Sequence, residues 1–520
     1  MRLQKTLIII KLFLALIGLM PEAVAQVPPR IIVKEVEIVG NTVFTDAELK
    51  EAIALPKSPV TIEKLLQLFP DKLTNYYVER GYISSGAILP PQKITDGKIQ
   101  IQIVESTLSA VEIRGLSRLK DSYIRKRLPK LDKPLNVKTL ARSLAKLQND
   151  SLIEKLKGEI IQQNQGKNIL LLSIEEAPSL NASLRFTDSY SHSIGNFGGA
   201  ANITHNNLLG FGNRLTLDRS QTEGLTRTGG SYSFLLNSLN GRVSFSYTTA
   251  KSEVVESELQ DLDIEANYDA FVFDLRQPII SNLEEELTLS VGLRYINSET
   301  FVLSDLSFAF TEGLENGESN ITILNLSQEY SKNNDNSLIA IRSQFDIGLN
   351  AFDATKTEVG IDGMFWKWLG DFQYLVFLNE EKDTVLATQI VTQLTPDKLL
   401  PIEQFTLGGL GSIRGYRRNI GSADNGVLGT IEFQLPLTEE NWGNISILPF
   451  FDVGTIWSND RETTGSNTFA SIGLGLRYQI ESAFEARIDY GIPLVETSGF
   501  GTSETTNNFT FSLIVRPLSF

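Results

Sequence analysis

The sequence predicts two small α+β modules followed by a transmembrane antiparallel β-barrel of about 16 strands. Two observations lead to this fold class. Between Ile31 and Glu175, strand-like and helix-like segments follow one another in an order that occurs twice, which suggests two copies of one module. From Pro178 onward, alternating segments of roughly ten residues succeed one another between clusters of Gly, Asn, Asp and Ser, as is typical of barrel strands.

The first 25 residues have the features of a secretory signal peptide. Arg2 and Lys5 precede a mostly apolar run, and the Ala-Val-Ala sequence at residues 23–25 has the small-x-small pattern that signal peptidase cleaves. A membrane anchor is the alternative, but Lys11 interrupts the run and leaves it shorter than the roughly 20 residues that span a bilayer. We therefore expect residues 1–25 to be removed.

The first module, residues 26–105, begins with an alternating strand at Ile31–Val39. Apolar residues then recur at helical spacing, most clearly over Thr61–Arg80. Two further strands are expected at Tyr82–Leu89 and Lys98–Glu105. The predicted order is therefore β-α-α-β-β.

The second module, residues 106–177, repeats this order. A strand at Leu108–Arg114 precedes helical patterns at Lys120–Leu128 and Asn136–Asn149, and two strands follow, the last ending at Glu175. We therefore expect two related domains before the barrel.

Residues 178–520 are assigned to the barrel. Polar and apolar residues alternate clearly in Leu287–Tyr295, Phe484–Tyr490 and Phe509–Arg516, and roughly 20 residues for each strand with its turn give about 16 strands. A soluble all-β protein is the alternative. The aromatic residue Phe520 at the end of an alternating strand favours a membrane barrel, whose closure also removes the unpaired edges that lipid would not tolerate.

Composition argues against several classes of function. There is no cysteine, and neither His192 nor His205 has an Asp, Glu or His neighbour at ligand spacing, so no metal site or histidine-dependent enzyme is expected. The formal net charge of −15 argues against a nucleic-acid partner. No Gly-Lys-Ser/Thr sequence follows the glycines between Gly408 and Gly415, which argues against nucleotide binding. We expect no cofactor and no catalytic site.

One motif lies in the first module. Residues 77–87, Tyr-Val-Glu-Arg-Gly-Tyr-Ile-Ser-Ser-Gly-Ala, are followed by Pro90-Pro91-Gln92. This stretch resembles the first periplasmic POTRA domain of two-partner secretion translocators, the haemolysin and adhesin exporters. The β-α-α-β-β order is also the POTRA order.

Two further motifs lie in the predicted barrel. They resemble the Arg-Gly-Tyr loop and the Phe-x-Asp wall motif of the wider outer-membrane assembly and translocation superfamily. The loop residues are Ile413, Arg414, Gly415 and Tyr416, and the wall residues are Phe450, Asp452 and Gly454. The resemblance implies that the loop lies inside the barrel and that Arg414 pairs with Asp452, because a guanidinium can bind a carboxylate with two hydrogen bonds.

The resemblance implies an outer-membrane pore that exports protein without nucleotide hydrolysis. The POTRA domains would bind an unfolded client in the periplasm, a large secreted exoprotein of β-helical fold, and the barrel in the outer-membrane lipid would pass it to the cell surface. The alternative is an insertase that assembles barrel proteins with the same loop, although such factors usually carry more POTRA domains. A diffusion porin would not explain the two modules.

The resemblance also suggests where the client binds and what closes the pore. The client is expected to add as a strand to an edge of the first POTRA sheet, where main-chain bonding tolerates many sequences. That edge consists of Tyr82, Ile83, Ser84, Ser85, Gly86, Ala87, Ile88 and Leu89. The side chains of Tyr82, Ile83 and Ile88 are expected to pack in the core. Some relatives carry a plugging helix before the first POTRA domain, but the strand at Ile31 starts soon after the signal, so the Arg414 loop is the main candidate for occlusion.

Overall fold

The computed structural model describes residues 30–131, 133–162, 167–303, 306–311, 314, 317–358, 361–440, 442–459, 467–496 and 506–519. The predicted signal peptide at residues 1–25 and the terminal Phe520 lie outside the described residues. The chain divides into two compact units, one with the first module and one with the barrel, and the residues of the second module are shared between them. In the described ranges, no helix is long and apolar enough to cross a membrane.

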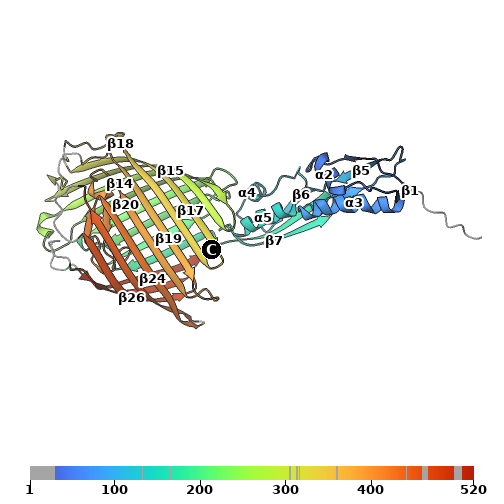
Figure 1. The fold of residues 1–520 in the computed structure, drawn as a ribbon. Helices are drawn as coiled ribbons and strands as arrows, with labels where there is room; N and C mark the ends of the chain where they lie inside the picture. Colours follow the sequence, from blue (N-terminus) through green and yellow to red (C-terminus); the bar gives the residue numbers. More distant parts are fainter. Residues whose placement is uncertain are drawn as a thin grey trace, which may run out of the picture. The chain divides into compact units, whose positions relative to one another are not determined.

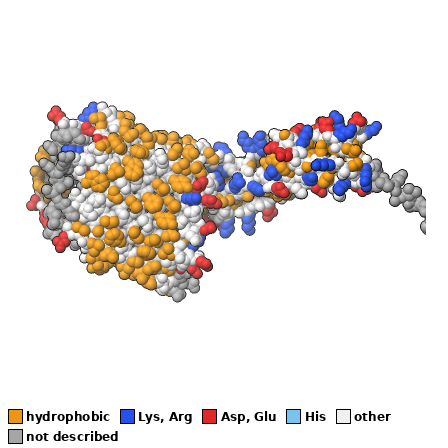
Figure 2. Space-filling model, in the orientation of Figure 1, with side chains coloured by type: hydrophobic (Ala, Val, Ile, Leu, Met, Phe, Trp, Pro, Cys, Tyr) orange, Lys and Arg blue, Asp and Glu red, His pale blue; other side chains and the backbone are white. Residues whose placement is uncertain are grey.

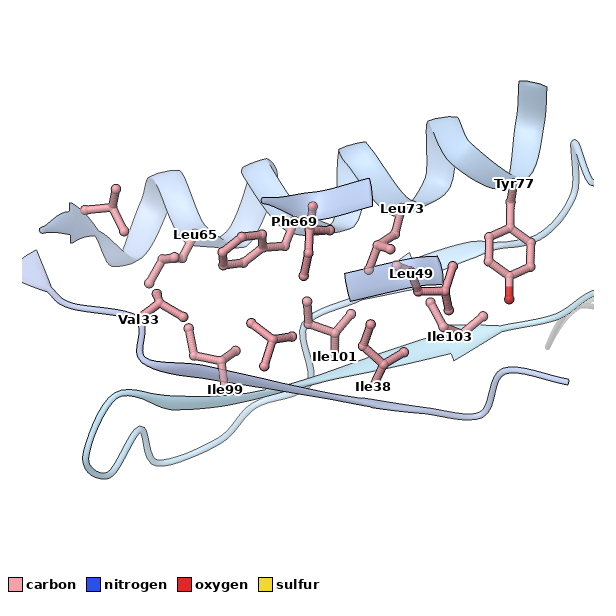
Figure 3. Close-up of a cluster of buried hydrophobic side chains, with 14 residues drawn as sticks. Val33, Ile38, Leu49, Leu65, Phe69, Leu73, Tyr77, Ile99, Ile101 and Ile103 are labelled. Carbon is pink, nitrogen blue, oxygen red and sulfur yellow. The ribbon is translucent and has the colours of Figure 1, made fainter. Parts of the chain in front are cut away.

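The first module has a three-stranded sheet with two helices on one face (Figures 1 and 3). Its strands, in the sheet order β2-β5-β4, are β2 (Glu35–Val39), β5 (Lys98–Val104) and β4 (Gly86–Ile88). Its helices are α2 (Asp46–Ile53) and α3 (Ile62–Glu79), and the short β1 (Arg30–Ile31) pairs with β3 (Val60–Thr61). Strand β5 is parallel to β2 and antiparallel to β4.

The core of this module forms where alternate residues of a strand face one side of a helix. Every second residue of β5, namely Ile99, Ile101 and Ile103, points toward the helices and is buried. They face the buried side of α3, which is formed at four-residue spacing by Leu65, Phe69, Leu73 and Tyr77 (Figure 3). Burying each of these large apolar side chains contributes roughly 1.5–3 kcal/mol, so the helix and the sheet stabilise each other.

A glutamate just after β5 closes the module. The Glu105 carboxylate accepts hydrogen bonds from the backbone N–H groups of Thr42 and Val43, at 2.8 and 2.9 Å, and from the Tyr77 hydroxyl at 2.8 Å. Burial alone would raise the pKa of Glu105, but the hydrogen bonds from Thr42, Val43 and Tyr77 together lower it below its ordinary value. The folded state therefore favours the ionised carboxylate.

The second module repeats the order of the first. Its elements are β6 (Thr107–Arg114), α4 (Asp121–Arg125), α5 (Val137–Gln148), β7 (Ile153–Gln162) and β8 (Lys167–Glu176), and its sheet order is β6-β8-β7. The strand-end glutamate is repeated as well. Glu176 accepts from the backbone N–H groups of Ser117 and Leu119 at 2.7 and 2.9 Å, so both modules close the turn after their first strand in the same way.

The remaining strands close into a 16-strand antiparallel barrel, which confirms the predicted fold class and strand number (Figure 1). In ring order the strands are β9 (Leu180–Thr187), β10 (Gly198–His205), β11 (Arg214–Thr222), β12 (Leu225–Leu235), β13 (Arg242–Glu253), β14 (Glu265–Ser281), β15 (Glu285–Val302), β17 (Glu318–Asn334), β18 (Ser337–Leu349), β19 (Trp366–Phe377), β20 (Val385–Leu394), β24 (Asn425–Glu440), β25 (Gly443–Trp457), β26 (Thr468–Ile480), β27 (Phe484–Pro493) and β29 (Phe509–Ser519). The two-residue β16 (Leu306–Ser307) pairs with the end of β15. Pairing of β29 with β9 completes the ring.

The barrel wall is apolar outside and more polar inside. In β15, Leu289 and Val291 are exposed on the outer face, whereas Thr288 and Ser290 are buried on the inner face. Figure 2 shows hydrophobic side chains over much of the wall that is visible from this side. This alternation is what a barrel needs when lipid surrounds it and water fills it.

We predict that replacing Glu105 with Gln destabilises the first module, because the amide keeps the shape but loses the charge that the N–H groups bind. The expected loss is on the order of 1–2 kcal/mol at neutral pH. Since folding lowers the pKa of Glu105, this contribution is complete above the ordinary Glu value of 4.5 and is lost as the pH falls below it.

Hydrogen–deuterium exchange of the intact protein measures this loss in the first module. Glu35→Gln is the matched control, because Glu35 pairs with Lys98 at an exposed site. Equal exchange rates in Glu105→Gln and the control at pH 7 would contradict the prediction.

Candidate functional site

A long segment between β20 and β24 carries the predicted loop motif. This segment, residues 395–424, is called the lumen loop here. It contains the short helix η4 (Pro401–Glu403) and the short strands β21 (Phe405–Leu407), β22 (Gly415–Tyr416) and β23 (Gly421–Ala423). Pairing of β21 with β23 folds the segment back on itself, and its side chains contact residues on the inner face of the wall.

The Arg414 guanidinium is buried inside the barrel against a wall carboxylate. Its Nε donates to Oδ2 of Asp452 at 2.8 Å and its Nη2 donates to Oδ1 at 2.7 Å, while the backbone N–H of Arg414 donates to Oδ2 at 3.1 Å. The guanidinium carbon lies 3.4 Å from the centre of the Phe450 ring. Arg414 is 4% exposed and Asp452 is 0% exposed. The planar guanidinium therefore fixes both the position and the angle of residues 413–416, which are called the tip of the loop here.

Three further charged residues of the wall complete an ionic cluster. Nη1 of Arg414 donates to Glu432 on β24 and lies 3.5 Å from Asp489 on β27. Arg487, also on β27, donates to both carboxylate oxygens of Asp489 and to Glu432, each at 2.7 Å. Two guanidiniums thus share three carboxylates from β24, β25 and β27. This pairing offsets the large cost of removing these charges from water.

Glycines allow the loop backbone to approach the wall closely. Gly415 has a φ of 91°, and a Cβ on it would lie 2.8 Å from the carbonyl carbon of Gly491 on β27. A Cβ on Gly491 would in turn lie 2.6 Å from the nitrogen of Gly415, so neither position accepts a side chain. On β25, a Cβ on Gly454 would lie 3.0 Å from the Ile413 side chain. The missing atoms make room for the tip.

The apolar residues of the motif pack beside the ionic cluster. Ile413 and Tyr416 are both fully buried, and Phe469 belongs to the same apolar cluster. The rings of Tyr416 and Phe469 meet edge to face with their centres 5.5 Å apart. The Tyr416 hydroxyl lies 2.9 Å from the carbonyl oxygens of Ala470 and Val495 and can donate to either. Polar and apolar contacts therefore hold the same tip.

The structure brings the two predicted motifs into direct contact, but the sequence analysis missed part of the site. The residues it missed are Glu432, Arg487, Asp489 and Gly491. Arg487 and Asp489 alternate with apolar residues in a strand that the sequence predicts, so a shared inner face could have been inferred. Their meeting with Arg414 depends on the strand register, which alternation does not reveal.

The predicted client-binding edge is shorter than expected. Within Tyr82–Leu89 only Gly86–Ile88 forms a strand, β4, which lies at the edge of its sheet. The Ser85 N–H donates to the Tyr82 carbonyl at 3.0 Å and closes a turn instead. The prediction of a strand over the whole of Tyr82–Leu89 is therefore wrong.

The side chains of this stretch divide into two groups. Tyr82 and Leu89 pack against the buried core of the module. Ile83 is 57% exposed and Ile88 is 51% exposed, so the expectation that these two pack in the core is wrong. The turn before β4 points Ile83 away from the core, and the alternation of β4, which buries Ala87, points Ile88 outward. The edge thus presents two apolar side chains to solvent.

Side chains already occupy main-chain groups along the open edge. The Ala87 N–H donates to the Thr74 hydroxyl of α3 at 3.0 Å rather than to a neighbouring strand. Beyond the end of β4, the Gln92 amide accepts from the Gln100 N–H of the central strand β5 at 2.8 Å and donates to the Gln100 carbonyl at 2.6 Å, as a strand would. A peptide that adds to the β4 edge must displace the bond between Ala87 and Thr74.

Comparison with known proteins decides the family. Residues 166–478 match the family described as haemolysin secretion/activation protein ShlB/FhaC/HecB. The chain belongs to this family. Residues 31–106 match the ShlB-type POTRA domain, so the first module is a POTRA domain. The resemblance to two-partner secretion translocators, which the loop and POTRA motifs indicated, is confirmed.

Relatives of the chain cover most of its length. The heme/hemopexin transporter protein HuxB of Haemophilus influenzae is 22% identical over 450 residues, which are 82% of this chain and 76% of the relative. The outer membrane transporter CdiB of Escherichia coli is 21% identical over 493 residues, 90% of this chain and 79% of the relative.

Solved structures show the same fold. CdiB from Escherichia coli superposes with a TM-score of 0.70 at 18% identity, covering 96% of this chain and 93% of the other. BamA from Haemophilus ducreyi, lacking POTRA domains 1–3, superposes with a TM-score of 0.58 at 16% identity, covering 93% and 99%. The barrel fold is therefore shared with both structures.

We predict that Arg414→Lys and Asp452→Ala each release the loop tip from the wall. Removing one partner of a buried pair costs roughly 3 kcal/mol, although water in the lumen would reduce this figure. The fraction of time that the pore conducts in planar bilayers should therefore rise at least about tenfold, since tenfold corresponds to about 1.4 kcal/mol.

The double variant should conduct little more than either single one, because both changes break the same contact. Arg342→Ala is the control, since Arg342 pairs with Glu329 on the wall. Effects that multiply in the double variant would show that Arg414 and Asp452 act independently.

Proposed function

We propose that the chain is an outer-membrane pore that exports a large secreted exoprotein of β-helical fold to the cell surface without nucleotide hydrolysis. The observation that carries the proposal is the lumen loop, which non-covalent contacts attach to the inside of a closed barrel in a chain of this family. Such contacts can be broken and reformed without a chemical reaction. Folding of the client outside the cell would make export effectively irreversible.

The proposal assigns a compartment to each part of the chain. Residues 1–25 direct secretion and are removed. Residues 26–105 and 106–177 form two POTRA domains in the periplasm, which bind the unfolded client. Residues 178–520 form the barrel, and its apolar outer face contacts the lipid of the outer membrane.

An insertase would use the barrel differently. It must pass client strands sideways into lipid, so its ring must open between two strands, whereas an export pore uses only the lumen. In this chain β29 pairs with β9 from Ser512 opposite Thr187 to Ser519 opposite Asn181, with one irregularity between Val515 and Leu518. Paired strands along this junction favour export through the lumen.

We predict that a disulfide across this junction leaves export unchanged. Leu184 and Val515 are directly opposed, and the natural chain has no cysteine, so Leu184→Cys with Val515→Cys gives one defined crosslink. Secretion of the exoprotein is compared in the oxidised and reduced double variant, with each single variant as a control. If oxidation stops secretion and reduction restores it, the ring must open sideways, and the insertase becomes the better explanation.

The proposal places client binding on the β4 edge, within the segment of Tyr82 to Leu89. A client segment in extended form would replace the Thr74 hydroxyl at the Ala87 N–H and cover the exposed Ile83 and Ile88. Main-chain bonding of this kind accepts many client sequences. The exposed apolar side chains would add affinity without strict specificity.

A matched pair of variants tests this edge. Thr74→Ala removes the competing hydroxyl and should bind the unfolded exoprotein at least as tightly as the natural chain. Adding Ala87→Pro removes the main-chain donor itself, and affinity should fall by roughly tenfold, the value of about one hydrogen bond. Binding is measured on the purified full chain, and circular dichroism checks its folding. Equal affinity of the two variants would exclude β4 as the client-binding edge.

A further inference from the structure

The lumen loop has a second ionic attachment near its start. The Glu403 carboxylate lies 3.0 Å from Nη2 of Arg294 on β15 and 2.7 Å from Nζ of Lys367 on β19. Asp346 on β18 lies 3.8 Å from the same Arg294 nitrogen. Glu403 and Lys367 are 4% and 5% exposed. This cluster shares no residue with the Arg414 cluster.

Hydrogen bonds between side chains and main-chain groups join the two ends of the loop at this place. Lys367 Nζ donates to the Glu403 carbonyl at 2.9 Å. The Gln393 amide donates to the carbonyls of Glu403 and Asp424, at 3.0 and 2.8 Å, so it bridges the outgoing and returning limbs. The Asp424 carboxylate accepts from the Leu399 N–H at 2.9 Å. We call this part of the loop, with Leu399, Leu400, Glu403 and Asp424, the root.

Apolar packing supports the root separately from the tip. Leu399 and Leu400 are each 2% exposed and pack with Ile296, Ile321 and Phe365 of the barrel. The apolar cluster at the tip contains none of these residues. Root and tip therefore have separate ionic and apolar contacts.

The two attachments engage different arcs of the ring. The root contacts β15, β18, β19 and β20, whereas the tip contacts β24, β25 and β27. Separate strands of the wall therefore hold the root and the tip.

We propose that Glu403 is a positioning residue that keeps the root of the lumen loop docked while the tip leaves Asp452. The loop then opens as a tethered segment that pivots about the root, and it does not leave the wall as one body. The role of this movement in export rests on the proposed function. The movement itself belongs to the chain and does not require a client.

The difference in tethering follows from the positions along the chain. Glu403 lies nine residues after the end of β20 and Asp424 directly precedes β24, so the groups of the root lose little chain entropy on docking. Arg414 lies 20 residues after β20 and 11 before β24, and the tip is held by the Arg414, Ile413 and Tyr416 side chains. Beyond the tip, Arg417 pairs with Glu256 and Arg418 donates to the Ser189 carbonyl. Loss of the tip contacts leaves the root contacts in place.

Single cysteines report on the two attachments separately. Leu400→Cys places a buried thiol at the root and Ile413→Cys places one at the tip, in a chain that has no other cysteine. Each is introduced into the natural sequence, into Asp452→Ala and into Glu403→Gln. The rate of labelling by a membrane-impermeant maleimide is measured on the inserted barrel, whose folding is checked by heat-modifiable gel mobility. No client is present, so failed export does not affect the result.

Asp452→Ala should raise labelling at the tip by at least about tenfold and leave labelling at the root unchanged. Glu403→Gln should raise labelling at the root and leave labelling at the tip unchanged. The control is Glu329→Gln, which removes a lumen carboxylate paired with Arg276 and should change neither rate. The proposal is overturned if Asp452→Ala exposes root and tip equally, because the loop then leaves as one body. It is also overturned if Glu403→Gln leaves the root protected.

Discussion

The buried guanidinium of Arg414 is the constraint on which the inner structure of the barrel depends. A charge removed from water must be paired completely, and the wall supplies Asp452, Glu432 and Asp489 for this purpose. Close approach of the tip then requires glycine at positions 415 and 491. The buried Arg414 thus accounts for Asp452 on the wall and for the glycines where the loop meets it.

The rule that a charge shielded from water must be paired also applies to single glutamates in the periplasmic modules. Glu105 and Glu176 each accept backbone N–H groups from the turn that follows the first strand of their module. Side chains such as Thr74 and Gln92 occupy main-chain groups that the sheet leaves open. Open edges are a liability in solution, and these bonds limit wrong pairing.

Sequence reasoning reached the fold class because alternation and turn residues are local signals. It reached the Arg414–Asp452 contact only through resemblance, since the two residues are on different segments and no local pattern joins them. Glu432 and Asp489 were missed because their meeting depends on register across β24 to β27. The strand at Tyr82–Leu89 was overextended because a turn bond at Ser85 cannot be distinguished from a strand by β-propensity alone.

The central claim is that the Arg414 contact holds the loop across the resting lumen. Spin labels at Gly411, where a Cβ would meet no atom within 4 Å, and at Thr388 on β20 allow their separation to be measured by pulsed electron paramagnetic resonance. The account predicts one narrow distance distribution in the natural chain and a broad one after Asp452→Ala. An equally narrow distribution in both would contradict it.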